Sequence, residues 1–178
     1  METTKNKLPQ DKQIFFDKLS NYLDLKLYFF GSIQRKDYFP KSSDIDVAIF
    51  TDSISSTIIK IQNYLNVKRS DFKKFVWRLN TTNEVVTGYK MMYKNPEKDI
   101  IAEFSIYDEK YKPFILNEYN LKKDLPFYAT YLLIILKFLF YSLSIIPAEW
   151  YIAGKRFILT YIINKEEDNF VVLDLKDK

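Results

Sequence analysis

The sequence predicts an α+β fold, in which a small mixed sheet is flanked by helices and followed by a helical C-terminal part. Three observations favour this fold. Apolar residues recur at helical spacing from residue 12 to residue 23. Short apolar runs separated by turn residues fill the chain from residue 25 to residue 107, as is typical of strands. A long apolar segment, residues 127–146, lies between two prolines and predicts a buried helix.

The individual elements follow from local pattern and turn chemistry. In the first half we expect helix 12–23, strand 25–30, a turn or short helix at 32–41, strand 44–50, and helix 53–65 with Ser53 as its N-cap. Next come strands 72–79, 84–93 and 99–107, the last two joined by a turn at 95–98, and then helices 111–119, 127–146 and 147–164. The final segment, residues 169–176, forms a short strand or packs as a tail.

The composition restricts the chemistry of any active site. The chain has 178 residues, enough for one domain or one domain with a short helical appendage. It contains no cysteine and no histidine, which excludes disulfides, thiolate or imidazole metal sites and histidine bases within this chain. Carboxylate oxygens favour hard cations such as Mg²⁺ or Mn²⁺. The net charge of +4 permits a polyanionic partner without requiring one.

The sequence also bears on location. The first residues lack the apolar stretch of a secretory signal, which predicts a cytoplasmic protein. Residues 127–146 are about long enough to cross a membrane, so a membrane-attached protein is the alternative. Lys137 at the centre of this segment, where a charge costs roughly 2.5–3.5 kcal/mol in a bilayer, favours a buried core helix instead.

Two aspartates mark a candidate site. Side chains alternate along a strand, so Asp44 and Asp46 share one face while Ile45 and Val47 point into the core. Two carboxylates on one face repel each other, and either a cation or a proton must offset that repulsion. An Asp-x-Asp strand alone is more often a solvated sheet edge, so the prediction depends on what accompanies it.

A Gly-Ser pair accompanies it. Gly31 and Ser32 follow an apolar strand directly, thirteen residues before Asp44. Glycine lets the backbone approach a phosphate closely, and backbone amides and the serine hydroxyl can then bind phosphate oxygens. A phosphate cradle beside a carboxylate pair is the arrangement that a metal-bound nucleoside triphosphate needs.

Gly31-Ser32, Arg35 and the Ser43–Val47 run (SDIDV) resemble the signature of the DNA polymerase beta-like nucleotidyltransferase superfamily. This superfamily includes poly(A) polymerases, terminal uridylyltransferases and small antitoxin-type nucleotidyltransferases. The resemblance implies an enzyme with a nucleotidyltransferase-like sheet, a nucleotide bound by Gly31 and Ser32, and a metal bound by Asp44 and Asp46. Arg35 is either a further nucleotide contact or a surface residue.

The resemblance also implies a third carboxylate on a later strand, and Glu103 occupies that place, with an exposed strand face as the alternative. The family usually has Asp there, so Glu103 is a departure that puts full activity in question. Relatives carry a lysine within an apolar helix that contacts the triphosphate, and Lys137 resembles it; otherwise Lys137 extends from a packed helix to solvent. Residues 154–157 occupy the place of a serine-containing motif of the family, with altered chemistry.

We therefore predict a metal-dependent nucleotidyltransferase that uses a nucleoside triphosphate, with ATP the expected one. The acceptor would be a hydroxyl, on an RNA 3′ end, a protein, a second nucleotide or a small molecule. The alternative is a nucleotide-binding or antitoxin-like regulatory protein that retained the fold without turnover. We divide the chain into a catalytic domain, residues 1–120, and a helical part, residues 121–178, packed on it.

Overall fold

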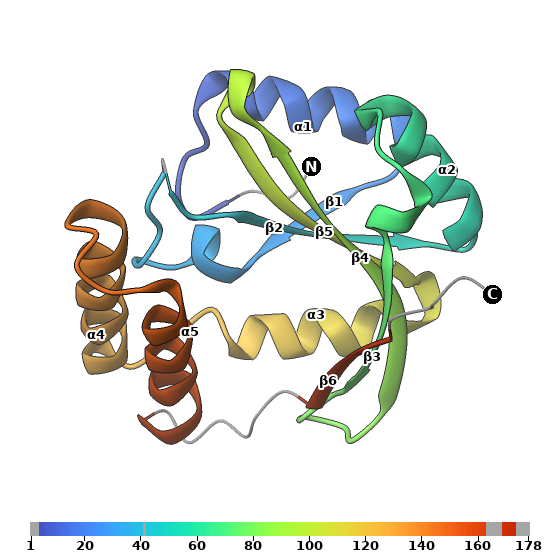
Figure 1. Ribbon diagram of the computed structural model, residues 1–178. Coiled ribbons are helices and arrows are strands. Elements are labelled where there is room, and N and C mark those ends of the chain that lie inside the picture. The colour runs from blue at the N-terminus through green and yellow to red at the C-terminus, as the bar shows by residue number, and fades with distance from the viewer. Residues whose placement is uncertain (1–3, 41, 163–168, 174–178) are drawn as a thin grey trace.

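A mixed sheet runs through the middle of the protein in the computed structural model, which describes residues 4–40, 42–162 and 169–173 (Figure 1). In this part of the chain the strand order is β1-β2-β5-β4-β3-β6. The parallel pair is β2–β5, and the other neighbouring strands are antiparallel. The strands are β1 Leu27–Phe30, β2 Ile45–Thr51, β3 Lys73–Arg78, β4 Val85–Asn95, β5 Ile100–Asp108 and β6 Asn169–Leu173. This sheet confirms the predicted α+β class.

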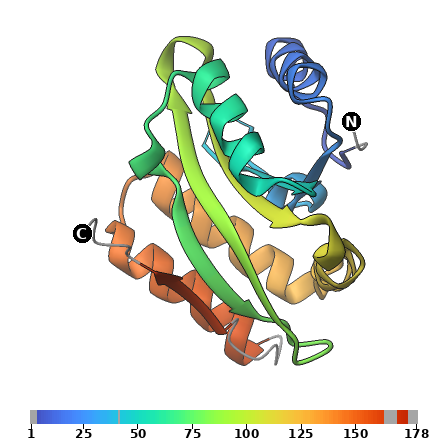
Figure 2. The same cartoon turned by 90° about the vertical axis from the view of Figure 1, so that its right-hand side faces the viewer.

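Helices cover both faces of the sheet, as Figures 1 and 2 show. On one face lie α1 (Gln10–Leu23) and α2 (Ile54–Leu65), and on the other lies α3 (Lys112–Leu121). Beyond the C-terminal end of α3 stand α4 (Phe127–Lys137) and α5 (Ala148–Phe157). The sheet is therefore the central layer between two groups of helices.

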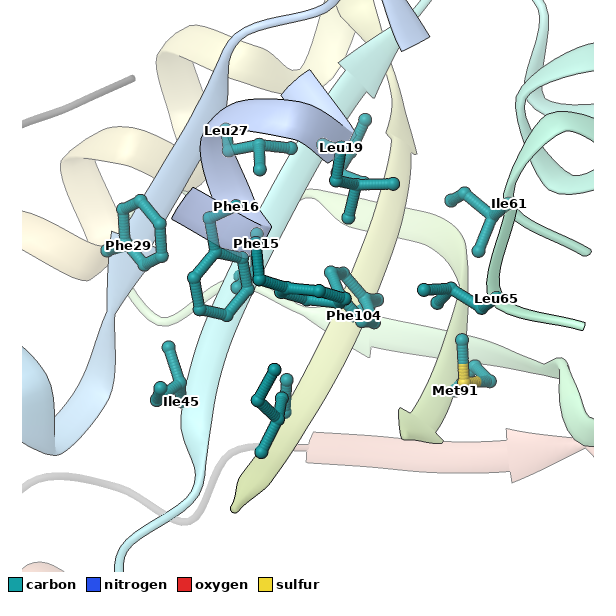
Figure 3. Close-up of a cluster of buried hydrophobic side chains, with 14 of the residues drawn as sticks. Phe15, Phe16, Leu19, Leu27, Phe29, Ile45, Ile61, Leu65, Met91 and Phe104 are labelled. Atoms are coloured by element: carbon teal, nitrogen blue, oxygen red, sulfur yellow. The ribbon is translucent and has the colours of Figure 1, made fainter. Parts of the chain in front are cut away.

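The larger core lies between the sheet and α1 and α2 (Figure 3). Phe16 of α1 is fully buried there, and its ring centroid lies 5.2 Å from that of Phe29 and 6.4 Å from that of Phe104. The residues of β2 that point to this side, Ile45 and Val47 among them, are almost completely buried. This confirms the predicted alternation in β2, because Asp46 must then face the opposite side.

A second core lies between the sheet and α3. Ile115 and Tyr119 of α3 pack there with Phe50, Phe75 and Tyr107 of the sheet. The sheet face that α3 covers in part is therefore the face that carries Asp46.

The predicted cap of α2 is wrong in its chemistry. Ser53 stands at the N-cap position, but its side chain makes no capping hydrogen bond. Its backbone amide donates instead to Thr51 Oγ1 at 3.2 Å, and the Thr57 hydroxyl lies 2.9 Å from the same oxygen. The start of α2 is therefore stabilised by the hydroxyl of Thr51, the last residue of β2, and not by the side chain of Ser53.

The predicted long helix, residues 127–146, is shorter than expected. The α-helical part ends at Lys137 and continues as a π-helical turn, Phe138–Ser142, before Ser144 takes a left-handed conformation with φ +52°. In the described part of the chain, we find no helix with both the length and the apolar character needed to cross a bilayer. The structure therefore contains no such helix at 127–146, where the membrane alternative required one.

The C-terminal part is not wholly helical. The helix predicted at 147–164 comprises α5 and a π-helical turn, Ile158–Ile162, and residues 163 and 164 lie outside the described residues. Residues 169–173 form β6, which pairs antiparallel with β3, whereas residues 174–176 also lie outside the described residues. The second part of the chain thus contributes a strand to the sheet of the first, and the proposed boundary at residue 120 stays a prediction.

The larger core gives a direct test of the fold. Phe16→Ala should lower the free energy of unfolding by about 3–5 kcal/mol, because it leaves a cavity against Phe29 and Phe104. Ile14→Ala is the matched control: Ile14 belongs to the same helix but is 45% exposed, so the loss should be below about 1 kcal/mol. Urea unfolding followed by circular dichroism measures both, and equal losses would contradict the packing described.

Candidate active site

Two carboxylates lie side by side on neighbouring strands. Asp46 of β2 and Glu103 of β5 are register partners in the parallel pair, so their backbones are about 4.8 Å apart. Asp44 lies two residues before Asp46, just ahead of the first residue of β2. The neighbours of Glu103 along β5, Ala102 and Phe104, are fully buried on the opposite side. Glu103 therefore faces the same side of the sheet as Asp46.

The turn after β1 lies against Asp46. Phe30, the last residue of β1, is the register partner of Asp46, and Gly31 follows it with φ +70°. A Cβ atom at Gly31 would lie only 1.8 Å from Asp46 Oδ2. Both the backbone angle and the lack of space therefore require glycine here. The sequence had suggested a close approach to phosphate, and the structure adds a close approach to a carboxylate.

Ser32 is the second residue of a short 3₁₀ turn, Gly31–Gln34. It is buried, and its hydroxyl has no hydrogen-bond partner among the described residues. Buried hydroxyl groups are usually hydrogen-bonded, so one without a partner at a cavity is a reason to expect a ligand or solvent there.

The predicted site residues line a single cavity of about 260 Å³. The walls of this active-site cavity come from the sheet, from α3 and from the C-terminal helices. They contain all seven predicted residues: Gly31, Ser32, Arg35, Asp44, Asp46, Glu103 and Lys137. Other wall residues were not foreseen from the sequence, namely Phe30, Trp77, Ser105, Tyr107, Tyr119, Lys122, Tyr141, Tyr151, Lys155 and Leu159.

The carboxylates have altered acidity. Burial, followed by the negative charges of Asp44 and Glu103, raises the pKa of Asp46 to about 8, although Lys155 and Arg35 partly offset the effect. Burial and the charge of Asp44 also raise the pKa of Glu103, against the opposing charges of Lys90 and Lys155. Asp46 is therefore largely protonated at neutral pH unless a cation binds beside it.

The donor set fits a hard divalent cation, since it consists of carboxylate oxygens. The described residues contain no group of three such side chains already arranged to hold a metal ion. Asp44, Asp46 and Glu103 nevertheless line one cavity, so a cation would have to draw their side chains together.

A buried ion network lies on one side of the cavity. Asp37 is completely buried, and Arg35 Nε and Nη2 donate to its two carboxylate oxygens at 2.8 and 3.1 Å. Burial opposes the ionisation of Asp37, but the hydrogen bonds and charges of Arg35 and Lys137 outweigh it and lower the pKa of this carboxyl. Asp37 was not predicted to matter. Its position two residues after Arg35 was the signal available in the sequence.

Lys137 joins the same network. Its ammonium lies 3.1 Å from Asp37 Oδ2, 2.6 Å from the Asp37 carbonyl oxygen and 3.4 Å from Ser43 Oγ. The side chain is 4% exposed, so it does not extend to solvent as the alternative interpretation required. Burial lowers the pKa of Lys137, although Asp37 acts in the opposite direction.

The raised pKa of Asp46 makes cation binding dependent on pH. Below about pH 8 the folded protein holds a proton on Asp46 that a cation must displace, so Mn²⁺ affinity should rise with pH by up to about tenfold per unit and level off above the pKa. Isothermal titration calorimetry in buffers of different ionisation enthalpy measures both affinity and proton release. Asp46→Asn is the control. An Mn²⁺ affinity independent of pH in the unmodified protein would contradict the assignment.

The chain was compared with curated proteins and with solved structures. None of the curated proteins compared matches the chain. Two solved structures that resemble it are a Cid1 poly(U) polymerase with MgGTP bound, at 19% identity and a TM-score of 0.41, and the GLD-2/RNP-8 complex, at 16% identity and a TM-score of 0.37. The first match covers 75% of this chain and 44% of the other, and the second covers 78% and 57%. The chain therefore spans about half the length of these structures.

A family model gives the assignment. The model described as nucleotidyltransferase domain matches residues 12–126, a range that contains β1 to β5 and all three candidate carboxylates. The match covers more than half of the 178 residues and confirms the resemblance noted in Gly31-Ser32 and the Asp44–Asp46 strand. The chain belongs to the nucleotidyltransferase domain family.

Proposed function

We propose that this nucleotidyltransferase moves a nucleoside monophosphate from a nucleoside triphosphate, ATP being the expected one, to a hydroxyl acceptor. The observation that carries the proposal is the register pairing of Asp46 with Glu103, beside a turn in which Gly31 leaves no space for a side chain. This pairing supplies a carboxylate site next to a backbone that a phosphate can approach.

The carboxylates are the proposed ligands of the divalent cation, Mg²⁺ or Mn²⁺. Asp44 and Asp46 would hold it, and Glu103 would complete the set of oxygen donors. A cation bound there would polarise the α-phosphate and lower the pKa of the attacking hydroxyl. The raised pKa values of Asp46 and Glu103 support this proposal, because a bound cation would stabilise the ionised form of both carboxylates.

The residues of the chain would act on the other groups of the reaction. Gly31 and Ser32 would bind phosphate oxygens through their backbone amides, and Ser32 would add its unpartnered hydroxyl. The acceptor oxygen forms a bond to the α-phosphorus as the bond from that phosphorus to the bridging oxygen breaks and pyrophosphate leaves. Glu103, with its raised pKa, would accept the proton that the hydroxyl loses.

The acceptor is proposed by class. An RNA 3′ end or a protein hydroxyl both provide the attacking oxygen, and the net charge of +4 is compatible with the RNA. The regulatory alternative, a protein that binds nucleotide and metal without turnover, remains a competing proposal because Glu103 stands where the family usually has Asp. Measurement of pyrophosphate release separates the two.

The first test measures pyrophosphate release. The protein should release pyrophosphate from one or more ribonucleotides in the presence of Mg²⁺ or Mn²⁺ and an acceptor RNA. Asp46→Ala should reduce the rate by at least about a thousandfold, because it removes a carboxylate required in the transition state. Its circular dichroism spectrum and thermal unfolding should show that the fold is kept.

The release assay distinguishes the transferase from the regulatory alternative. Activity that survives Asp46→Ala would overturn the proposed site. If metal and nucleotide bind but neither RNA nor protein acceptors stimulate release, the regulatory alternative gains support.

The second test concerns space. Gly31→Ala should lower the rate of pyrophosphate release by roughly a hundredfold or more, because the added methyl group would overlap the Asp46 carboxylate and the backbone has φ +70°. Gly154→Ala is the control, since the atoms nearest to a Cβ there belong to the flexible side chain of Leu136, at 3.1 Å and beyond, and can shift slightly to make room. Equal rates for Gly31→Ala and the unmodified protein would refute the close packing of turn and carboxylate.

A further inference from the structure

Four cationic side chains line the active-site cavity: Arg35, Lys122, Lys137 and Lys155. A nucleoside triphosphate carries several negative charges on its phosphates, and a metal ion offsets only some of them. At least one of these side chains is therefore expected to bind phosphate oxygens. The contacts of each cation indicate which one is available.

Arg35 and Lys122 already have partners. Arg35 forms a forked pair with the completely buried Asp37, which occupies its Nε and Nη2 donors. Lys122 lies 3.8 Å from Glu118 Oε1 and 5.2 Å from the centre of the Trp77 ring. Both cations are therefore already engaged by other side chains.

Lys137 is committed more completely. An ammonium group has three hydrogen atoms to donate. Three acceptors surround it: the carboxylate and carbonyl oxygens of Asp37 at 3.1 and 2.6 Å, and Ser43 Oγ at 3.4 Å. If Lys137 turned towards a phosphate, Asp37 would lose one of its two cationic partners, which is costly for a completely buried carboxylate.

Lys155 is different in each respect. It is an exposed residue of α5 that lines the same cavity, and no hydrogen bond or ion pair joins it to another residue of the described part of the chain. Its charge is felt by both Asp46 and Glu103, in each case favouring the ionised carboxylate. Among the residues that the structure describes, Lys155 is therefore a cation within electrostatic range of the carboxylates that has no other partner.

We propose that Lys155 is the residue that binds the β- and γ-phosphates of the nucleotide, and that Lys137 is a positioning residue. Lys137 would act through Asp37 and Ser43, fixing α4 against the loop that leads into Asp44. The proposal rests on the proposed function, since it assigns a second part to the same nucleotide site. It differs from the expectation from the sequence, in which Lys137 contacts the triphosphate.

The matched family region ends at residue 126, whereas Lys155 lies in α5, beyond that limit. The C-terminal helices would therefore supply a substrate-binding group and not only a cover for the sheet.

Direct binding of inorganic tripolyphosphate tests the proposal without turnover. Lys155→Met should weaken tripolyphosphate binding by about tenfold or more, and Lys155→Arg should restore most of the affinity. Lys18→Met, an exposed lysine of α1 on the opposite face of the sheet, is the matched control and should leave affinity unchanged. Isothermal titration calorimetry in Mg²⁺ measures the affinities, and thermal unfolding should show that Lys155→Met is as stable as the unmodified protein.

Lys137 should behave in the opposite way. Lys137→Gln should lower the melting temperature, since Asp37 loses a partner, but change tripolyphosphate affinity by less than about threefold in the folded protein. Its effect on transfer should fall on kcat with little change in KM for the nucleotide, through displacement of Asp44. If Lys137→Gln does not fold, Asp37→Asn combined with Lys137→Gln removes both charges and allows the same measurements.

The outcomes separate this proposal from the function on which it rests. Equal tripolyphosphate affinities for Lys155→Met and the unmodified protein, no tripolyphosphate binding at all, or a loss for Lys137→Gln as large as that for Lys155→Met would overturn the assignment of Lys155. A change in melting temperature alone for Lys137→Gln would overturn its positioning role. Tripolyphosphate binding that depends on Lys155, without pyrophosphate release from any nucleotide, would instead contradict the proposed transfer reaction and leave the phosphate site in place.

Discussion

The parallel pairing of β2 with β5 places Asp46 and Glu103 beside each other on one sheet face, and the rest of the site depends on this constraint. Backbone hydrogen bonds fix the two strands in register, so the backbones that carry the two carboxylates cannot move apart without loss of sheet structure. The resulting repulsion, added to burial, keeps the pKa of Asp46 near 8. Positive charge in the cavity is therefore a physical requirement of the fold whenever Asp46 is ionised.

The opposite face of the same strands explains how this arrangement is tolerated. Ile45, Val47 and Phe104 are buried between the sheet and the first two helices, and a slip of one residue would bring them to the cavity side. Burial of these apolar side chains therefore stabilises the β2–β5 register, whereas repulsion between the carboxylates destabilises it. Gly31 has a related part, because its missing side chain leaves the volume that the Asp46 carboxylate occupies.

Local pattern predicted most of the sheet and the carboxylates. Alternation in 44–50 correctly assigned a face to Asp46, because one buried face leaves a clear period of two in the sequence. The end of α4 was missed because an apolar run does not distinguish a continuing α-helix from a π-helical turn such as Phe138–Ser142. The Asp37–Lys137 pair was missed for another reason: one hundred residues separate the two, and no local spacing reports such a contact. Lys155 lies in the 154–157 segment noted from the sequence, but it was given no role, because an exposed lysine carries no pattern until the fold places it at a cavity.

Strand β6 has a consequence for the C-terminal helices. The chain leaves the sheet region through α3, forms α4 and α5, and returns to pair with β3, so the segment that carries Lys155 is tethered to the sheet at both ends (Figure 2). Closing a loop in this way restricts the volume its residues explore. We therefore expect this second attachment to raise the effective concentration of the Lys155 ammonium near the carboxylates, and cutting the chain between α5 and β6 to lower it without changing a residue of the cavity.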